Sequence, residues 1–233
     1  MTVKVETNLS KLPTWLKTST SSGAPQVQTE GTQRKTLGET PPIVVRWADH
    51  PDLVHLSTHY GAVQKARRKL RLLSGKDGKV LLAKNTVGAA DDKGNVYLGV
   101  EFLQENGGND ALLSAVMAHE WGHLISNTSK HGNLDHLSWE DIFKLRREEE
   151  SAADVFCGRM LAMMGYSPDA IVQFLLKAQS GNETLKYYAA PIRGAIIQEA
   201  HRLHAQRDEL TRKLFKKSIY PNPYTSRIIL ADE

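Results

Sequence analysis

The chain has 233 residues, of which 40% are hydrophobic and 24% are charged, a composition typical of a soluble globular protein. The formal net charge of +4 is small for this length, so charge alone gives no reason to expect a nucleic-acid partner. No stretch approaches the roughly 18 consecutive apolar residues of a membrane span, and the first residues have no apolar signal core. We therefore expect a cytoplasmic protein without a membrane span. The single cysteine, Cys157, excludes an internal disulfide framework.

Residues 1–42 are predicted to form a flexible N-terminal segment, followed by one domain over residues 43–233. Between residues 17 and 42 the chain is rich in Ser, Thr, Gly, Gln and Pro. It cannot bury enough apolar surface there to offset the entropy lost on ordering. The apolar residues around Trp15 leave a second interpretation open, in which a small element docks on the domain or on a partner protein.

The segment from Pro51 to Gly75 is predicted to be one helix, because proline is favoured at the first helical position and glycine just past the last. Its basic run, Lys65–Arg71, is a pattern found at nucleic-acid and anionic surfaces. The run has no interleaved aromatic residues and no recognisable binding fold around it. A solvated helix face is therefore the favoured interpretation.

Three strands are predicted, over Ile43–Trp47, Lys79–Ala83 and Asn95–Phe102, with a turn at Asp91–Gly94 before the last. A further extended segment lies between the second and third strands and comprises Asn85, Thr86, Val87, Gly88 and Ala89. Its glycine permits a close backbone approach, as an edge strand that receives a peptide substrate requires. An ordinary loop explains the same residues equally well.

Residues 111–126 are predicted to form a buried helix, because apolar residues recur on two stripes at helical period. His119 and His123 are four residues apart, so both imidazoles can reach one point off the helix surface. Glu120 stands at the edge of the same face, where it can contact a water molecule on a metal. This is the His-Glu-x-x-His arrangement of zinc peptidases, in the helical context that the motif requires.

A second helix is predicted from Trp139 to Met164. Ser138 and Asp141 form an approximate capping box at its start, and Gly165 is placed to end it. Beyond it we expect a helix from Pro168 to about Ala178. One or two more are expected within Thr184–Lys217, interrupted near Pro191.

Glu150 is the predicted third metal ligand. It belongs to an acidic run, residues 148–150, that would normally be a solvated patch, but only Glu150 has an acid four residues on, at Asp154. Asp154 lies one turn later and can accept the free N–H of a metal-bound imidazole, most simply that of His119. Three protein ligands and one position left for water are typical of catalytic zinc.

His119-Glu120-x-x-His123 followed by Glu150-x-x-x-Asp154 resembles the gluzincin metallopeptidases. The strongest resemblance is to the catalytic domain of the CAAX prenyl endopeptidases and bacterial heat-shock membrane proteases, without their membrane helices. Weaker similarity extends to residues 85–89, 95–100, 164–170, 218–221 and 227–228. The resemblance implies a zincin-like α+β fold, with a small twisted sheet on the zinc helix and a mainly helical C-terminal half.

The motif and the resemblance together predict a zinc-dependent endopeptidase with one Zn²⁺ per chain and a protein or peptide substrate. Glu120 is the expected general base. Tyr220, which stands where the family has histidine, and Arg227 are the expected donors to the oxyanion; packing of the C-terminal tail is the alternative for both. A narrowly specific processing, regulatory or toxin-type protease is the second interpretation. A non-catalytic interaction module stabilised by zinc is the third.

Overall fold

The computed structural model of the chain describes residues 42–126, 137–178, 184 and 186–218, with side chains described as far as residue 211. The N-terminal segment expected to be flexible lies outside these residues except for Pro42. Tyr220 and Arg227 also lie outside them, and their predicted roles stay predictions.

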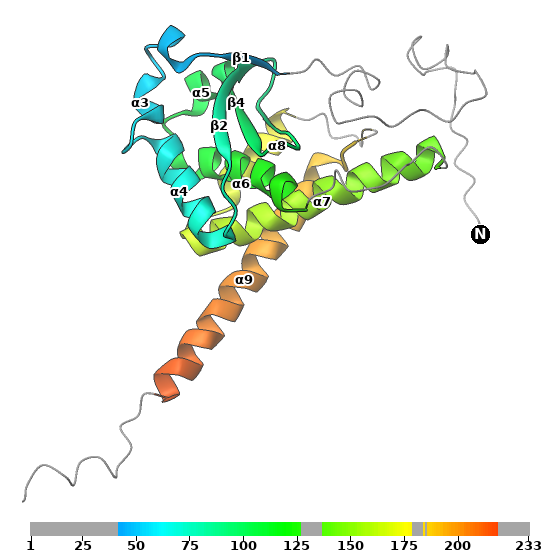
Figure 1. The fold of residues 1–233 in the computed structure, drawn as a ribbon. Helices are drawn as coiled ribbons and strands as arrows, with labels where there is room; N and C mark the ends of the chain where they lie inside the picture. The colour runs from blue at the N-terminus through cyan, green and yellow to red at the C-terminus, as the bar shows by residue number, and fades with distance from the viewer. Residues whose placement is uncertain (1–41, 127–136, 179–183, 185, 219–233) are drawn as a thin grey trace, which may run out of the picture.

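A small mixed sheet of four strands forms one layer of the described fold (Figure 1). Its strands are β1 (Ile43–Val45), β2 (Lys79–Lys84), β3 (Gly88–Ala90) and β4 (Asn95–Gly99), in the order β1-β2-β4-β3. The outer pairs, β1 with β2 and β3 with β4, are antiparallel, and the central pair is parallel. Strand β3 is consequently an edge strand, paired through Gly88–Leu98 to Ala90–Val96 on one side only.

Helix α6 (Asp110–Ser126) lies against this sheet and forms the centre of the molecule. Eleven of its 17 residues are buried, so it has no continuous polar face, as the two apolar stripes predict. Leu113, Met117 and Trp121 are fully buried and tie the helix into one core with the sheet and with α4 (Ala62–Ser74). The prediction of a buried helix over residues 111–126 is confirmed.

Helix α7 (Trp139–Met164) packs closely on α6. The Ser138 hydroxyl accepts from the backbone N–H of Asp141 at 3.1 Å, and Gly165 ends the helix with a positive φ of 76°, as predicted. The close approach depends on Gly122, where an added Cβ would lie 2.9 Å from the Ala153 Cα. A larger residue between the two histidines would push the helices apart.

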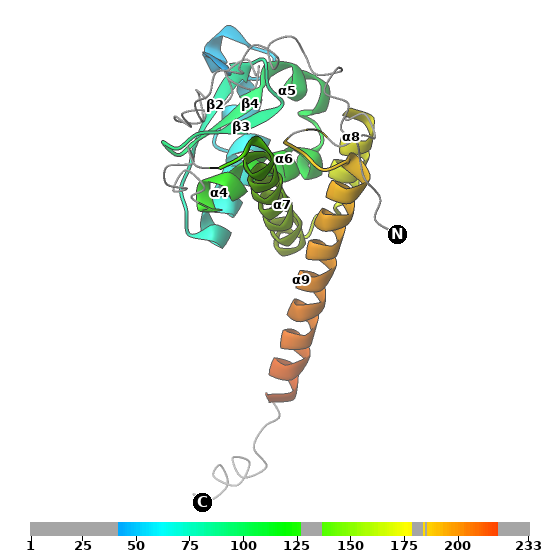
Figure 2. The same cartoon turned by 90° about the vertical axis from the view of Figure 1, so that its right-hand side faces the viewer.

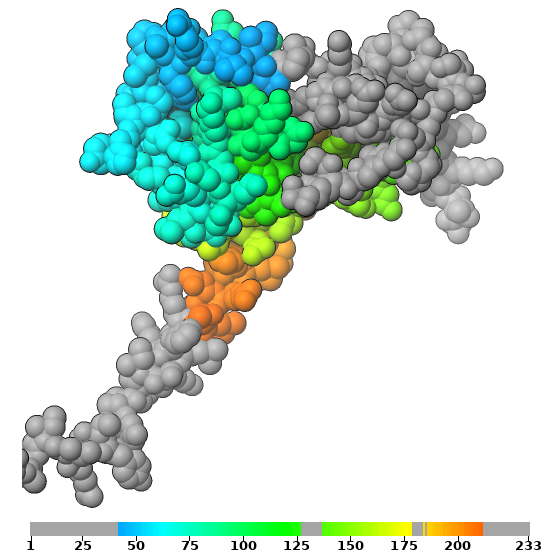
Figure 3. Space-filling model, viewed as in Figure 1, coloured from blue at the N-terminus to red at the C-terminus, as the bar shows by residue number. Residues whose placement is uncertain are grey.

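Helices α8 (Asp169–Ala178) and α9 (Ala190–Ser218) complete the C-terminal half. The N-terminal part of α9 packs on α7 and α8, and the rest stands out from the body (Figures 2 and 3). The expected interruption near Pro191 is wrong: Pro191 is the second residue of α9, where its missing N–H has no helical partner to lose. No helix among the described residues is long and apolar enough to cross a membrane.

Two further predictions are corrected in the N-terminal half. The helix expected from Pro51 to Gly75 is divided into α3 (Val54–Ser57) and α4, after a 3₁₀ turn, η2 (Trp47–Asp49). The break falls before Gly61, which has an extended backbone and lies too close to the Leu56 carbonyl for a side chain. Gly75 does end α4, with a φ of 71°.

The last predicted strand is shorter than expected. It ends at Gly99, and Val100 begins helix α5 (Val100–Asn106). The backbone of Gly99 lies against the Thr86 carbonyl, where no side chain fits, so the chain turns away from the sheet. Val100, Phe102 and Leu103 are buried as residues of this helix, because a short apolar run is as compatible with a buried helix as with a continued strand.

Candidate metal centre

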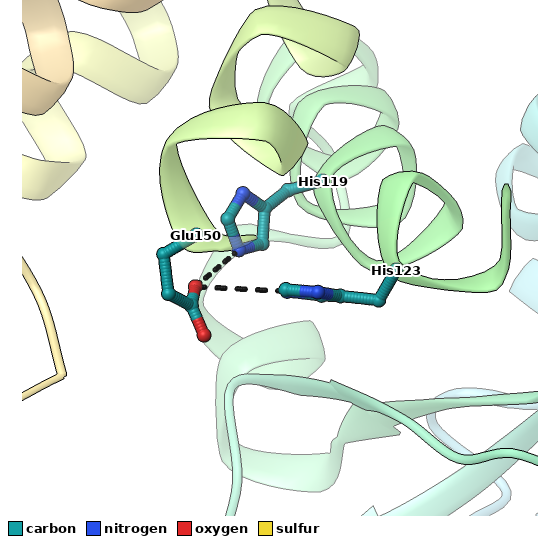
Figure 4. Close-up of side chains that lie close together, drawn as sticks. All are labelled: His119, His123 and Glu150. Carbon is teal, nitrogen blue, oxygen red and sulfur yellow. Dashed lines mark hydrogen bonds and ion pairs between the residues drawn. The ribbon is translucent and has the colours of Figure 1, made fainter. Parts of the chain in front are cut away.

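Two histidines and a glutamate converge where α6 and α7 pack together (Figure 4). The Nε2 atom of His119 lies 3.1 Å from Oε2 of Glu150, and Nε2 of His123 lies 3.6 Å from the same oxygen. The ligand atoms of the three residues all lie within 4.8 Å of one another. Residues 31 positions apart in the sequence thus meet at one point, as predicted.

The arrangement fits a zinc ion in chemistry and in size. Imidazole nitrogen and carboxylate oxygen are both normal zinc ligands. With ordinary bond lengths, two ligands of a tetrahedral zinc lie about 3.3 Å apart. The two observed nitrogen–oxygen separations of 3.1 and 3.6 Å bracket that value. These two separations therefore match a zinc site, and the three side chains could hold one zinc ion.

Asp154 lies behind His119, on the far side of the ring from Glu150. Its Oδ1 is 2.9 Å from Nδ1 of His119, in the place predicted for it. The contact is short but too bent to satisfy the N–H with good hydrogen-bond geometry. A carboxylate in this place favours a proton on Nδ1 and would leave Nε2, the nitrogen that faces Glu150, free to bind a metal.

Arg193 holds Asp154 from the first turn of α9, and sequence reasoning missed it. Its Nε donates to Oδ2 and its Nη2 to Oδ1, both at 2.8 Å. The two side chains are 8% and 1% exposed, so this is a buried, two-bond ion pair. No pattern marks Arg193 in the sequence, since its partner is 39 residues away on another helix.

Lys186 was also missed, and it contacts the third ligand. Its Nζ lies 3.1 Å from Oε1 of Glu150, the oxygen that does not face the histidines. The Lys186 ammonium lies 5.1 Å from the centre of the Tyr187 ring, and the Arg193 guanidinium lies 4.7 Å from it. Both cations thus contact one aromatic ring beside the site.

The charges of the centre shift the pKa values of its own side chains. Burial lowers the pKa of His119, but the carboxylates of Asp154, Glu150 and Glu120 outweigh it and raise that pKa to about 10. Burial raises the pKa of Glu150, but Lys186 and both histidines overcome it and hold that pKa well below its usual value. The pKa of Asp154 is also lowered, because the contacts with Arg193 and His119 exceed the effect of burial.

Glu120 lies beneath the edge strand β3. It is 9% exposed, and an added Cβ on Gly88 would come within 2.8 Å of its Oε1 and 2.9 Å of Cγ1 of Val116. The backbone of β3 therefore passes directly over the carboxylate, and only glycine leaves it room. A peptide paired with this edge would run beside Glu120.

The predicted substrate segment, Asn85 to Ala89, is only partly a strand. Strand β3 begins at Gly88, while Asn85 has a positive φ of 62°. The Thr86 hydroxyl donates to the Gly88 carbonyl at 2.6 Å, and the Val87 side chain is 42% exposed. The segment thus combines a tight turn at its start with an edge strand at its end.

Cys157 is a small, fully buried residue beside the centre. Its thiol donates to the Ala115 carbonyl at 3.3 Å, and burial raises its pKa. It is not one of the clustered ligand residues found in the part of the chain that the structure describes. His131 and His136, the histidines of the segment after α6, lie outside the described residues.

Comparison with protein-family models, with curated proteins and with solved structures finds no match to this chain. The resemblance to gluzincin peptidases accordingly rests on the motifs alone. The five residues His119, Glu120, His123, Glu150 and Asp154 are brought together by the fold.

Proposed function

We propose that this protein is a zinc-dependent endopeptidase. One observation carries the proposal: Nε2 of His119, Nε2 of His123 and Oε2 of Glu150 converge, with the Glu120 carboxylate one residue from the first ligand. A site that only stabilised a fold would need a fourth protein ligand and no adjacent carboxylate. Among the described residues, no fourth ligand joins the cluster.

The residues have separate tasks in this proposal. Bound zinc would supply a Lewis acid that acidifies the attacking water and polarises the scissile carbonyl. Glu120 accepts the proton of that water and later passes it to the leaving amine, for which its position beside the ligands suits it. Asp154 keeps His119 in the tautomer that presents Nε2, and Arg193 keeps Asp154 in place.

The substrate is proposed to bind as an added strand on β3. The free edge of β3 offers backbone groups to an extended peptide, and Gly88 brings that edge over Glu120. Any peptide can form such backbone hydrogen bonds. The geometry therefore favours cleavage within a chain rather than recognition of one terminus.

Tyr220 and Arg227 are proposed as the donors to the oxyanion. Substitution of Tyr220 by Phe removes only the hydroxyl, and loss of one such donor typically costs about 2.7–4 kcal/mol of transition-state stabilisation. A fall in kcat on the order of a hundredfold with little change in KM would support the assignment. A near-normal kcat would make Tyr220 a packing residue.

The proposal is tested by metal analysis together with a broad peptide-library cleavage assay on the purified protein. We expect one zinc per chain and cleavage by the wild type. Glu120→Gln should keep the zinc and lose the cleavage. Zinc without cleavage in either protein would favour a non-catalytic module, and cleavage of a single sequence would favour a processing protease. Equal cleavage by both proteins would remove Glu120 as the general base.

A further inference from the structure

The two carboxylate oxygens of Glu150 face different partners in the structure. Its Oε2 faces the nitrogens of His119 and His123 at 3.1 and 3.6 Å, while its Oε1 faces Nζ of Lys186 at 3.1 Å. One oxygen is thus directed to the metal position and the other is held by a cation. The Glu150 side chain is only 5% exposed, so water competes little for either oxygen.

Lys186 is held in this place by more than the ion pair. Its ammonium lies 5.1 Å from the centre of the Tyr187 ring, which the guanidinium of Arg193 also contacts. Arg193 in turn makes two hydrogen bonds to buried Asp154. The lysine therefore belongs to a connected set of side chains from residues 186–193 that lines one side of the centre.

Resting on the metal site proposed above, we propose that Lys186 is a positioning residue that restricts Glu150 to coordination through Oε2 alone. A carboxylate can bind a metal through one oxygen or through both. Because Oε1 is engaged by the ammonium, the second mode is blocked. Coordination through Oε2 alone would leave a position on a bound metal for water and for the substrate carbonyl, which catalysis would require.

Removal of Lys186 should change metal affinity in the opposite direction to removal of an ordinary residue that hydrogen-bonds to a metal ligand. Loss of a hydrogen-bonding partner behind a ligand usually weakens metal binding. Loss of Lys186 would instead free a second ligand oxygen and remove a cation that repels the metal. Metal affinity should therefore rise while the coordination changes and turnover falls.

The test uses Co²⁺ as a spectroscopic probe in the full-length protein, because its visible absorption weakens as the coordination number rises. In Lys186→Met we expect weaker visible absorption than in the wild type and binding of Co²⁺ that is about tenfold tighter. Lys186→Arg keeps the cation and should keep the wild-type spectrum. Lys177→Met, an exposed lysine at the end of α8, is the matched control and should change nothing.

An unchanged Co²⁺ spectrum in Lys186→Met, or weaker binding, would overturn the proposal. Lys186→Leu, which like Met cannot donate a hydrogen bond to Oε1, should reproduce the Met variant, and denaturant unfolding of both variants checks that they fold. Failure of the wild type to bind Co²⁺ would instead overturn the metal site itself. The two failures are therefore distinguishable.

Discussion

Two aspartates of this protein, the half-buried Asp91 and the buried Asp154, obtain their hydrogen-bond partners in different ways. Asp91, in the turn between β3 and β4, accepts from the backbone N–H groups of Lys93 and Asn95 and from the Asn95 and Tyr97 side chains, at 2.7–3.0 Å. All of its partners lie within six residues. Asp154 is 1% exposed, and its partners come from two other helices, with Arg193 39 residues away.

The difference shows which part of the molecule is built locally. The turn at Asp91 can form before the rest of the chain has packed, because its hydrogen bonds are between neighbours. The centre at Asp154 exists only when α6, α7 and α9 have met. Changes in the turn should therefore affect stability, whereas changes in the centre should affect metal binding and turnover.

The largest expected effect is at the third ligand. Glu150→Ala removes one of the three proposed metal ligands, so zinc content should fall from the expected one per chain to nearly none. Glu148→Ala, two residues earlier on the exposed face of α7, is the control and should keep its zinc. Metal analysis after dialysis measures both. Full zinc occupancy in Glu150→Ala would mean that the ligand lies elsewhere.

The second-largest expected effect is on zinc affinity, and it should differ between Asp154 and Asp91. Asp154→Asn should weaken zinc binding about 10–100-fold, because the amide supports His119 and holds Arg193 less well than the carboxylate does. Asp91→Asn makes the same chemical change in the turn between β3 and β4, at a side chain whose hydrogen-bond partners are all in that turn and in β4, and should leave the affinity unchanged. Competition with a chelator measures both variants. Equal affinities in the two would show that Asp154 does not support the metal site.

A smaller effect, on kcat, is expected at Gly88, where β3 lies over Glu120. In Gly88→Ala the added methyl group would press on Glu120, 2.8 Å away, and displace its carboxylate. We expect kcat to fall about tenfold with zinc content unchanged, since small misplacements of a catalytic group are costly. Gly108→Ala, where the added Cβ meets nothing within 4 Å, is the control. An unaltered kcat in Gly88→Ala would show that β3 does not position Glu120 for the reaction.

The smallest effect is at the turn. Asp91→Asn should lower the free energy of unfolding at pH 7 by about 1 kcal/mol, because the carboxylate is the better acceptor for its four donors. Burial raises the pKa of Asp91, but the hydrogen bonds from Asn95, Tyr97 and Lys93 lower it below 3.8. The advantage of the wild type is thus present above pH 3.8 and disappears as the pH falls through the lowered pKa. Denaturant unfolding of both proteins at pH 7 and under acid conditions measures this, and a difference that persists in acid would contradict it.

Much of the centre could be predicted because its parts are local patterns. The i, i+4 spacing of His119 and His123, the apolar stripes of α6 and the caps of α7 at Ser138 and Gly165 all depend on residues a few positions apart. The wrong predictions also have local causes. Val100–Phe102 is apolar enough for a strand or a buried helix, and Pro191 is as compatible with a helix start as with a break.

The sequence by itself determined where the candidate ligand residues lie: which helix carries the histidines, which glutamate follows on a second helix, and that an acid lies one turn beyond it. Helical period is enough for that, because it relates residues within one element. Only the tertiary structure decided which cations hold the two carboxylates. Arg193 reaches Asp154 through the packing of α9 on α7, and Lys186 reaches Glu150 from the segment just before α9. No spacing in the chain encodes a contact between separate elements.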